Sequence, residues 1–258
     1  MRATLGKSSR RFLAYCAIGV HVACIGAMAD PSADFAARRQ ALFELVLNGD
    51  SYNVHGQAIR IAAGQPLQGD VIEGSCAFID SRHDCADFHL NGILRLLHQF
   101  GDSPLLSPEL RNRMKSTVLG FKYWPDEPGI DSMCSWSENH YILFASAGYL
   151  AGQLCPDEVF TNSGKSGREL MATHRPRIAR WLDLRFHTGF SEWLSNVYYD
   201  EDLAAVLNLA DLCQDEWIAQ RAAMVTDLLL ADIARNSFRN SMPRTHGRSY
   251  EEHLKTTS

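Results

Sequence analysis

The segment 140–153 reads HYILFASAGYLAGQ and consists almost entirely of apolar and small residues. A helix that is apolar on all sides is normally surrounded by other elements of the protein, whereas a surface helix keeps one polar face. The sequence therefore predicts a buried helix over 140–153.

Apolar residues recur at helical spacing along most of the chain, and no segment alternates like a strand over more than a few residues. Asn48-Gly49 marks the end of the predicted helix 34–47, and Ser107-Pro108 marks the start of the predicted helix 107–121. Residues 50–69 are expected to form a loop, with some extended character at 57–62. Eight helices joined mostly by short turns predict an all-α fold of antiparallel helical hairpins. The predicted helices are 34–47, 70–81, 84–100, 107–121, 140–153, 166–187, 200–213 and 215–238.

Residues 1–29 have the layout of a secretory signal peptide. Residues 1–11 contain four basic residues and no acidic one, and residues 12–29 are free of charge. The segment ends in Ala27-Met28-Ala29, which has small residues at both positions that a signal peptidase reads. We expect cleavage after Ala29, with a retained membrane anchor as the alternative. The mature chain, 30–258, is then a secreted or periplasmic protein with a single all-helical domain.

Loss of residues 1–29 would take the net charge from −5 to −9, because they carry four positive charges and no negative ones. An acidic protein lacks the concentrated Lys and Arg that phosphate backbones require, which argues against nucleic acid as a partner. No later segment is apolar enough for stable membrane insertion. One or two disulfides can form in an oxidising compartment, Cys76 and Cys85 being the nearest pair, and free buried thiols are the alternative. The mature cysteines are Cys76, Cys85, Cys134, Cys155 and Cys213.

Two polar and aromatic segments stand directly before predicted helices: CSWSENHY at 134–141 and FSEWLSNVYYDED at 190–202. Hydrogen-bonding groups and aromatic faces at the ends of elements are typical of binding sites. The long irregular segment 122–139 also carries aromatic residues, which favours function over disorder. We expect the two segments to face each other across a cleft. The predicted ligand-binding residues are Trp124, Trp136, Glu192, Asn196 and Asp200.

Asn139 and His140 suit β-elimination on a uronic acid. The pair withdraws charge from the C5 carboxylate and so acidifies the neighbouring proton, which a tyrosine or the histidine then abstracts before protonating the leaving oxygen. Tyr198 and Tyr199 are the candidate tyrosines. The alternative is that His140 only caps a helix or is hydrogen bonded in the core.

The carboxylates of the same segments support a second chemistry. Two carboxyl groups that flank a glycosidic bond can hydrolyse it, one as acid and the other as base or nucleophile. Glu138 beside Trp136 is the candidate acid, and Asp200 is a candidate partner. Glu201 and Asp202 have a simpler explanation, since acidic side chains in a first helical turn complement the helix dipole.

The segment 82–89, RHDCADFH, concentrates residues that can ligate metal. Asp84 and Asp87, however, have the spacing of a helix N-cap and its capping box, so we expect a structural role there and no bound metal. Arg82 is a candidate contact for an acidic sugar.

Two further polar segments remain. Residues 162–167, NSGKSG, lack the first glycine of a nucleotide-binding loop, and no other cofactor motif is present, so we expect no cofactor. Residues 245–250, THGRSY, are rich in hydrogen-bond donors, and His246 and Arg248 are candidate contacts for anionic or hydroxylated groups. The alternative is a frayed tail.

With its signal, aromatic-rich loops, Asn139-His140 pair and later tyrosine, the chain resembles the (α/α)-toroid polysaccharide lyases of the alginate lyase and heparinase II/III type. It also looks like the helical-toroid glycoside hydrolases. The resemblance covers residues 80–250 at the level of architecture and two short motifs. It implies that Asn139 and His140 neutralise the substrate carboxylate and that Tyr198 or Tyr199 transfers the proton. Complete toroids contain more helices than are predicted here, so the resemblance implies a partial toroid.

The sequence therefore predicts a carbohydrate-active protein that cleaves an acidic polysaccharide or oligosaccharide by β-elimination. The alternatives are a glycoside hydrolase with paired carboxylates and a glycan-binding protein without catalytic activity.

Overall fold

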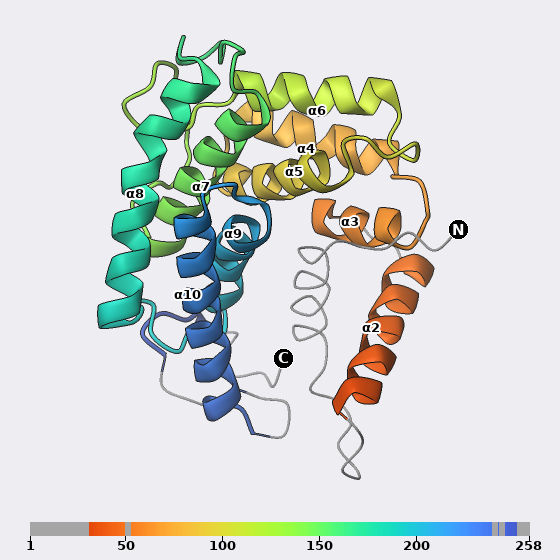
Figure 1. Ribbon diagram of the computed structural model, residues 1–258, viewed down its shortest axis with the longest axis vertical. Helices are drawn as coiled ribbons and strands as arrows, with labels where there is room; N and C mark the ends of the chain where they lie inside the picture. The colour runs from red at the N-terminus through yellow and green to blue at the C-terminus, as the bar shows by residue number, and fades with distance from the viewer. Residues whose placement is uncertain (1–30, 50–52, 239–241, 243–245, 252–258) are drawn as a thin grey trace.

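The computed structural model describes residues 31–49, 53–238, 242 and 246–251 (Figure 1). Within these residues there are nine α-helices and no named strand, which confirms the all-α class. The predicted signal peptide, 1–29, lies outside the described residues. Among the helices that the structure describes, none is both long enough and apolar enough to span a bilayer.

Eight helices correspond to the predicted ones, with boundaries shifted by a few residues. The ninth, α3 (Val54–Ala62), lies where a loop was predicted. The eight are α2 (Pro31–Asn48), α4 (Gly69–Ser81), α5 (Ala86–Phe100), α6 (Pro108–Gly120), α7 (Glu138–Leu154), α8 (Gly167–Thr188), α9 (Tyr198–Leu212) and α10 (Glu216–Asn236).

The predicted loop, with its extended character at 57–62, was wrong over 54–62, because α3 is short and depends on its neighbours. The Asn53 side chain caps the helix by accepting a hydrogen bond from the Gly56 N–H at 2.7 Å. Val54, Ala58 and Ile61 then lie buried in the core, where α3 packs against α5. A helix of this length is marginal in isolation, so its stability comes from this packing and was not visible in local propensity.

α7 is the buried helix predicted over 140–153, and it lies at the centre of the fold. It packs against α5, α8 and α9, and every residue from Ile142 to Gly152 is buried. Gly148 permits the close approach of α8, because a Cβ there would stand 2.5 Å from the ring of His174. In Figure 1, α4, α5 and α6 lie across the top of the molecule, while α7 to α10 run more upright beside them. Consecutive helices pack in pairs, α4 with α5, α7 with α8 and α9 with α10.

A buried polar network joins α5 to α7 and α9. Arg95 donates to Asp211 through both terminal nitrogens at 3.1 Å and to the Asn208 side chain at 2.6 Å. Asn208 in turn donates to the Asn91 carbonyl at 2.9 Å, and the Asn91 amide donates to the Leu143 carbonyl at 3.2 Å. Buried polar groups are costly unless they are paired in this way. The network therefore fixes the start of α5 relative to the start of α7, where the site residues lie.

Candidate functional site

The two polar and aromatic segments lie against each other at the start of α7. Glu138, the first residue of α7, accepts hydrogen bonds from the Ser191 hydroxyl at 2.7 Å and from the Glu192 N–H at 2.8 Å. It also forms an ion pair with Arg185 of α8. A surface cleft of about 640 Å³ lies between the segments, so both of them line one site.

Four residues that the sequence singled out line this cleft: Trp136, Glu138, Glu192 and Arg248. The Trp136 side chain is 83 % exposed, although a large aromatic side chain is normally buried. The cleft also contains residues that were not assigned to a ligand site, Asp84, Ser132, Cys134 and Ser191.

A second hollow, of about 410 Å³, adjoins the first. Both are lined by Trp136, Glu138 and Ser191, so together they form one groove with Trp136 between its two parts. The second part contains Arg180 and Arg185 of α8. Arg180 is exposed and forms no ion pair with any residue that the structure describes. We call the two hollows together the Trp136 groove.

The polar segment near the C-terminus is docked against the second of the two segments. The Gly247 N–H donates to the Trp193 carbonyl at 2.7 Å, and the Ser195 hydroxyl donates to the Arg248 carbonyl at 2.7 Å. His246 also hydrogen bonds through Nδ1 with the Leu194 carbonyl. Residues 246–250 are thus part of the site and not a frayed tail.

Arg248 connects this docked segment to a pair of tyrosines. Its guanidinium donates to Glu192 Oε1 at 2.6 Å and lies 4.0 Å from the centre of the Tyr198 ring. The Tyr198 hydroxyl hydrogen bonds to the hydroxyl of Tyr250, which is 47 % exposed. Burial and this hydrogen bond raise the pKa of Tyr198, while the charge of Arg248 opposes the rise.

Tyr199 has a structural role. Its side chain is 2 % exposed, and its hydroxyl accepts a hydrogen bond from the Leu194 N–H at 2.9 Å and donates to Asp232 at 3.4 Å. Burial raises the pKa of Tyr199 to about 12. Its position places the phenol under the turn before α9, where it holds Leu194 in a left-handed conformation with φ of 50°.

Asn139 and His140 are adjacent in sequence but have different surroundings. Asn139 is 1 % exposed; its Oδ1 accepts from the Ser137 hydroxyl at 2.6 Å, and its Nδ2 has no hydrogen-bond partner among the described residues. Asn139 therefore faces the protein interior. His140 approaches Asp87 through Nδ1 at 2.6 Å and Asp84 through Nε2 at 4.0 Å. Burial disfavours the charged imidazole, but the hydrogen bond and charge of Asp87 outweigh it and raise the pKa of His140.

The predicted capping box at Asp84 and Asp87 is absent. The N-cap of α5 is Cys85, in a left-handed conformation with φ of 71° and without a side-chain cap. Asp84 instead accepts a hydrogen bond from the Cys134 N–H at 3.0 Å, and Asp87 is fully buried against His140. The cap prediction was wrong because tertiary partners, invisible in the local spacing, engage both carboxylates.

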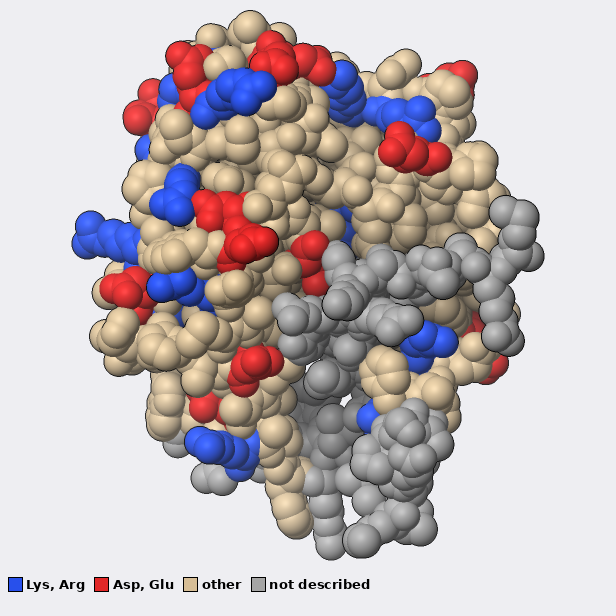
Figure 2. All heavy atoms as spheres, in the orientation of Figure 1, with Lys and Arg blue, Asp and Glu red and all other residues tan. Residues whose placement is uncertain are grey.

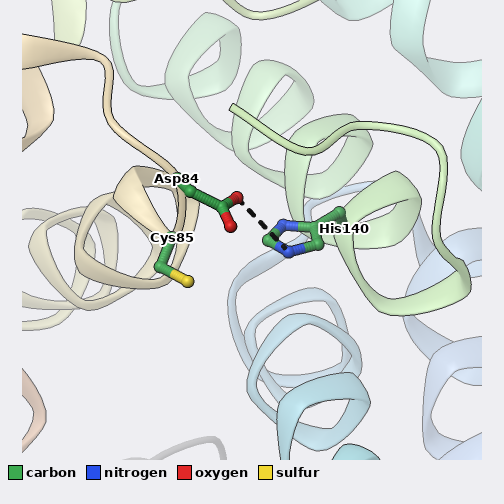
Figure 3. A group of neighbouring side chains, drawn as sticks. All are labelled: Asp84, Cys85 and His140. Carbon is green, nitrogen blue, oxygen red and sulfur yellow. Dashed lines mark ion pairs between the residues drawn. The ribbon is translucent and has the colours of Figure 1, made fainter. Parts of the chain in front are cut away.

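Asp84, Cys85 and His140 converge at the edge of the Trp136 groove (Figure 3). Their side chains come from the starts of α5 and α7, and one donor atom of each lies within 4.8 Å of the others. The set combines a carboxylate, a thiol and an imidazole, which are the ligand types that zinc accepts. The signal for this cluster was present in the sequence as the concentration of ligand residues at 82–89.

A second cluster joins three carboxyl groups under the cleft. Glu138, Glu192 and Asp202 have oxygen atoms within 4.8 Å of one another. Asp202 is fully buried, and neither of its oxygens has a hydrogen-bond partner in the described residues. Burial, and then the charge of Glu192, raise the pKa of Asp202 well above its ordinary value. Asp202 therefore points into the protein and is not a surface acid that complements the helix dipole.

Trp124 and Arg82 lie elsewhere. The Trp124 ring packs edge-on against Tyr141 and His174, and the Arg177 guanidinium lies 3.7 Å from its centre. Arg82 caps the C-terminus of α4 and donates through its guanidinium to the Gly120 carbonyl and to Asn162. Neither lines the Trp136 groove.

Asn196 and Asp200 are close to the site in sequence but do not line the groove. The Asn196 side chain accepts a hydrogen bond from the Ser249 hydroxyl at 3.4 Å and so helps to dock residues 246–250. Asp200 is exposed in the first turn of α9.

None of the five cysteines in the described residues forms a disulfide. Cys76 and Cys155 are buried, whereas Cys85 is exposed. The nearest pair in sequence, Cys76 and Cys85, is not joined because Cys76 faces the core from α4.

Figure 2 shows Lys and Arg side chains interspersed with Asp and Glu over the described part of one face, without a continuous basic field. No protein-family model matches the chain, and neither the curated proteins nor the solved structures contain a match to it.

Proposed function

We propose that the protein is a secreted or periplasmic carbohydrate-active protein that binds an acidic polysaccharide in the Trp136 groove and cleaves it by β-elimination. We include in the proposal that its helices form part of an (α/α) toroid, which the pairwise packing of consecutive helices supports. The observation that carries the proposal is the position of Trp136, an exposed aromatic side chain between two hollows that both contain arginine.

The shape of the groove suits a polymer. Two hollows on either side of one exposed ring can hold successive sugar units, with Trp136 stacking on the apolar face of one of them. Aromatic rings with polar groups around them bind ligands that are partly apolar and partly hydrogen bonding. Ser137 and Ser191, which line both hollows, supply hydroxyl groups for sugar hydroxyls.

The charges of the groove favour an acidic sugar. Arg180 and Arg185 lie in one hollow and Arg248 in the other, so cationic side chains occur on both sides of Trp136. Guanidinium groups bind carboxylates through paired hydrogen bonds. Arg185 and Arg248 already pair with Glu138 and Glu192, whereas Arg180 is exposed and forms no ion pair with a described residue, so Arg180 is the free cation for a substrate carboxylate.

We assign proton transfer to Tyr198, which does not itself line the two hollows but lies under the guanidinium of Arg248, a residue of the cleft. The deprotonated Tyr198 oxygen accepts the C5 proton and then gives that proton to the leaving glycosidic oxygen, so that the C4–O bond breaks as the C4–C5 double bond forms. Burial raises the pKa of Tyr198, and the positive charge of Arg248, 4.0 Å from the ring centre, opposes this and favours the deprotonated form. Tyr250, hydrogen bonded to Tyr198 and partly exposed, connects the pair to solvent. His140 acts on the substrate carboxylate from the edge of the groove, through Nε2, the nitrogen that faces the groove residue Asp84.

Hydrolysis by paired carboxylates is less well supported. Both oxygens of the Glu138 carboxylate are engaged by the protein, Oε1 by Arg185 and Oε2 by the Ser191 hydroxyl and the Glu192 N–H. Asp200, the predicted partner of Glu138, does not line the groove, and Asp202 has a raised pKa but is fully buried.

The two chemistries leave different products. Elimination creates a 4,5-unsaturated uronic end that absorbs in the ultraviolet, whereas hydrolysis creates only a reducing end. A panel of polyuronates and neutral glycans should therefore give rising ultraviolet absorbance on a polyuronate, and Trp136→Ala should abolish it. Trp217→Ala is the matched control, because Trp217 is also exposed but lies at the start of α10, outside the groove. Reducing ends without ultraviolet absorbance would reject elimination.

A further inference from the structure

We propose that Asp84, Cys85 and His140 bind a divalent transition-metal ion, with zinc as the best fit, at the edge of the Trp136 groove. The proposal departs from the expectation that segment 82–89 has only a structural role. Ion binding by these residues is independent of the proposed function; only the role that we give the ion toward a substrate rests on it.

The geometry needs little adjustment to form such a site. The three donor atoms already lie within 4.8 Å of one another, and Figure 3 shows the Asp84 carboxylate and the Cys85 sulfur on the side facing His140. Ligand atoms at about 2.0–2.3 Å from a tetrahedral zinc are roughly 3.5 Å apart. Asp84 and Cys85 are exposed, so their side chains can close this difference by rotation, while the buried His140 stays in place.

His140 has the second partner that metal-binding histidines usually have. Its Nδ1 lies 2.6 Å from Asp87 Oδ2, and Asp87 is fully buried in the first turn of α5. Such a carboxylate holds the proton on Nδ1, directs the other nitrogen to the metal and makes it more basic. The remaining nitrogen, Nε2, is the one that faces Asp84. The tilted Phe88 ring, 5.2 Å from the imidazole centre, further restricts the orientation of His140.

The donor set selects the class of metal. Calcium and magnesium prefer oxygen ligands only, whereas an imidazole and a thiolate favour zinc and related transition metals. Three protein ligands leave the fourth position of a tetrahedral ion open, as in catalytic zinc sites. Asp84 lines the groove, so this open position would face a bound ligand.

A metal ion at this position completes the proposed chemistry. Asn139 faces the interior and cannot withdraw charge from a substrate carboxylate together with His140. An ion held by His140 would do so by binding the carboxylate directly, as a Lewis acid.

Metal binding can be measured without any glycan. The tag-free chain, stripped with a chelator, is titrated with Co²⁺, whose bond to a thiolate produces a charge-transfer band in the near ultraviolet. We expect one equivalent to bind, displacement by Zn²⁺, and a rise in the melting temperature with Zn²⁺. Cys85→Ser should remove the charge-transfer band, and Asp87→Asn should weaken affinity by about 10–100-fold. Cys213→Ser, which changes a half-buried thiol at the end of α9, should behave as the parent.

Each outcome of the metal titration either supports or overturns the proposed site. Substoichiometric binding by the parent, or a band that persists in Cys85→Ser, would overturn the site. Since both Asp84 and Cys85 are exposed, Asp84→Asn and Cys85→Ser should melt like the metal-free parent, and loss of binding in folded variants supports the site. Metal binding without any activity on polyuronates would reject the proposed function and leave the metal site standing. Activity on a polyuronate without metal binding would reject the metal site and leave the proposed function standing.

Discussion

His140 Nδ1 lies 2.6 Å from the Oδ2 atom of Asp87, a residue 53 positions earlier in the chain. The contact joins the first turn of α7 to the first turn of α5, and both side chains are buried. Because the buried carboxylate occupies one imidazole nitrogen, the other is directed toward Asp84 and the edge of the Trp136 groove. One pair of residues therefore sets the orientation of the group that both proposals depend on.

The two adjacent tyrosines should respond differently to loss of their hydroxyls. Tyr199→Phe leaves the buried Leu194 N–H without its partner, at a cost of about 1–3 kcal/mol in the free energy of unfolding. Tyr198→Phe removes a hydrogen bond to the partly exposed Tyr250 and should cost about 1 kcal/mol. Activity per folded molecule should fall only in Tyr198→Phe. Urea unfolding and the ultraviolet assay on both variants measure this, and loss of activity in Tyr199→Phe alone would reverse the assignment.

Gly247→Ala should detach the segment 246–250 from the site. The added Cβ would stand 2.8 Å from the Trp193 nitrogen and 3.0 Å from the Ser191 carbonyl oxygen, and backbone atoms cannot move aside as a flexible side chain can. Limited proteolysis should then cut the C-terminal segment faster than in the parent, and ligand affinity should fall because Arg248 leaves the groove.

Gly74→Ala is the matched control for this substitution. Gly74 lies inside α4 with no atom within 4 Å of the added Cβ, so the change should stabilise the protein by about 0.5–1 kcal/mol. Unchanged proteolysis of Gly247→Ala would show that the docking of residues 246–250 is not tight.

Asp202→Asn should stabilise the protein at neutral pH. Burial and Glu192 raise the pKa of Asp202, so the folded state keeps a proton that the unfolded state releases above about pH 4. The contribution of Asp202 to the free energy of unfolding is therefore fully present below about pH 4 and is lost as the pH rises toward the raised pKa of the folded state. Asparagine resembles the protonated acid, so the gain at pH 7 should exceed about 1 kcal/mol and should shrink toward pH 4. Asp157→Asn, at an exposed position, should have little effect at either pH.

Equal destabilisation of Asp202→Asn at pH 4 and pH 7 would contradict this expectation. It would mean that Asp202 is ionised in the folded protein and supports Arg185, whose pKa is lowered by burial.

His174 should make the protein sensitive to mild acid. It is fully buried between α7 and α8, and burial, with the charges of Arg177 and Lys165, lowers its pKa to about 3. Below its ordinary pKa the unfolded chain takes up a proton that the folded one does not, so stability falls as pH decreases. The loss should be about 2–3 kcal/mol between pH 6.5 and 4.5.

His174→Leu should remove this part of the pH dependence. Neither ring nitrogen has a hydrogen-bond partner in the described residues, so an apolar replacement should cost little at pH 7. His187→Leu, an exposed position on the same helix, should keep the pH dependence of the parent. An unchanged slope in His174→Leu would show that this histidine is not the sensitive group.

The sequence predicted the parts of the fold that depend on local signals. The apolar segment 140–153 predicted a buried helix, which is α7, and Ser107-Pro108 marked the start of α6, where the Ser107 side chain caps the helix. The helix α3 was not predicted, because its helical state depends on packing against α5. The same limit applies to Asp84 and Asp87, whose spacing suggested a cap but whose partners, Cys134 and His140, lie about fifty residues away.

The candidate site was likewise predicted only as far as local sequence signals reach. Composition identified the two segments at 134–141 and 190–202, which line one groove. It did not show which side chains point into that groove, because Tyr199 and Asn139 are turned inward by bonds to Leu194 and Ser137. Such orientations are decided by tertiary contacts that residue type and spacing do not specify.

The most direct test compares two oligosaccharides of equal length, an oligouronate and the same chain with its carboxyl groups reduced to alcohols. Calorimetric titration should show binding of the oligouronate at one site, at least about tenfold weaker binding by Trp136→Ala and by Arg180→Ala, and no measurable binding of the reduced chain. Trp217→Ala should bind like the parent. Equal affinity for the two oligosaccharides, or an oligouronate affinity of Trp136→Ala equal to that of the parent, would contradict a groove built for an acidic glycan.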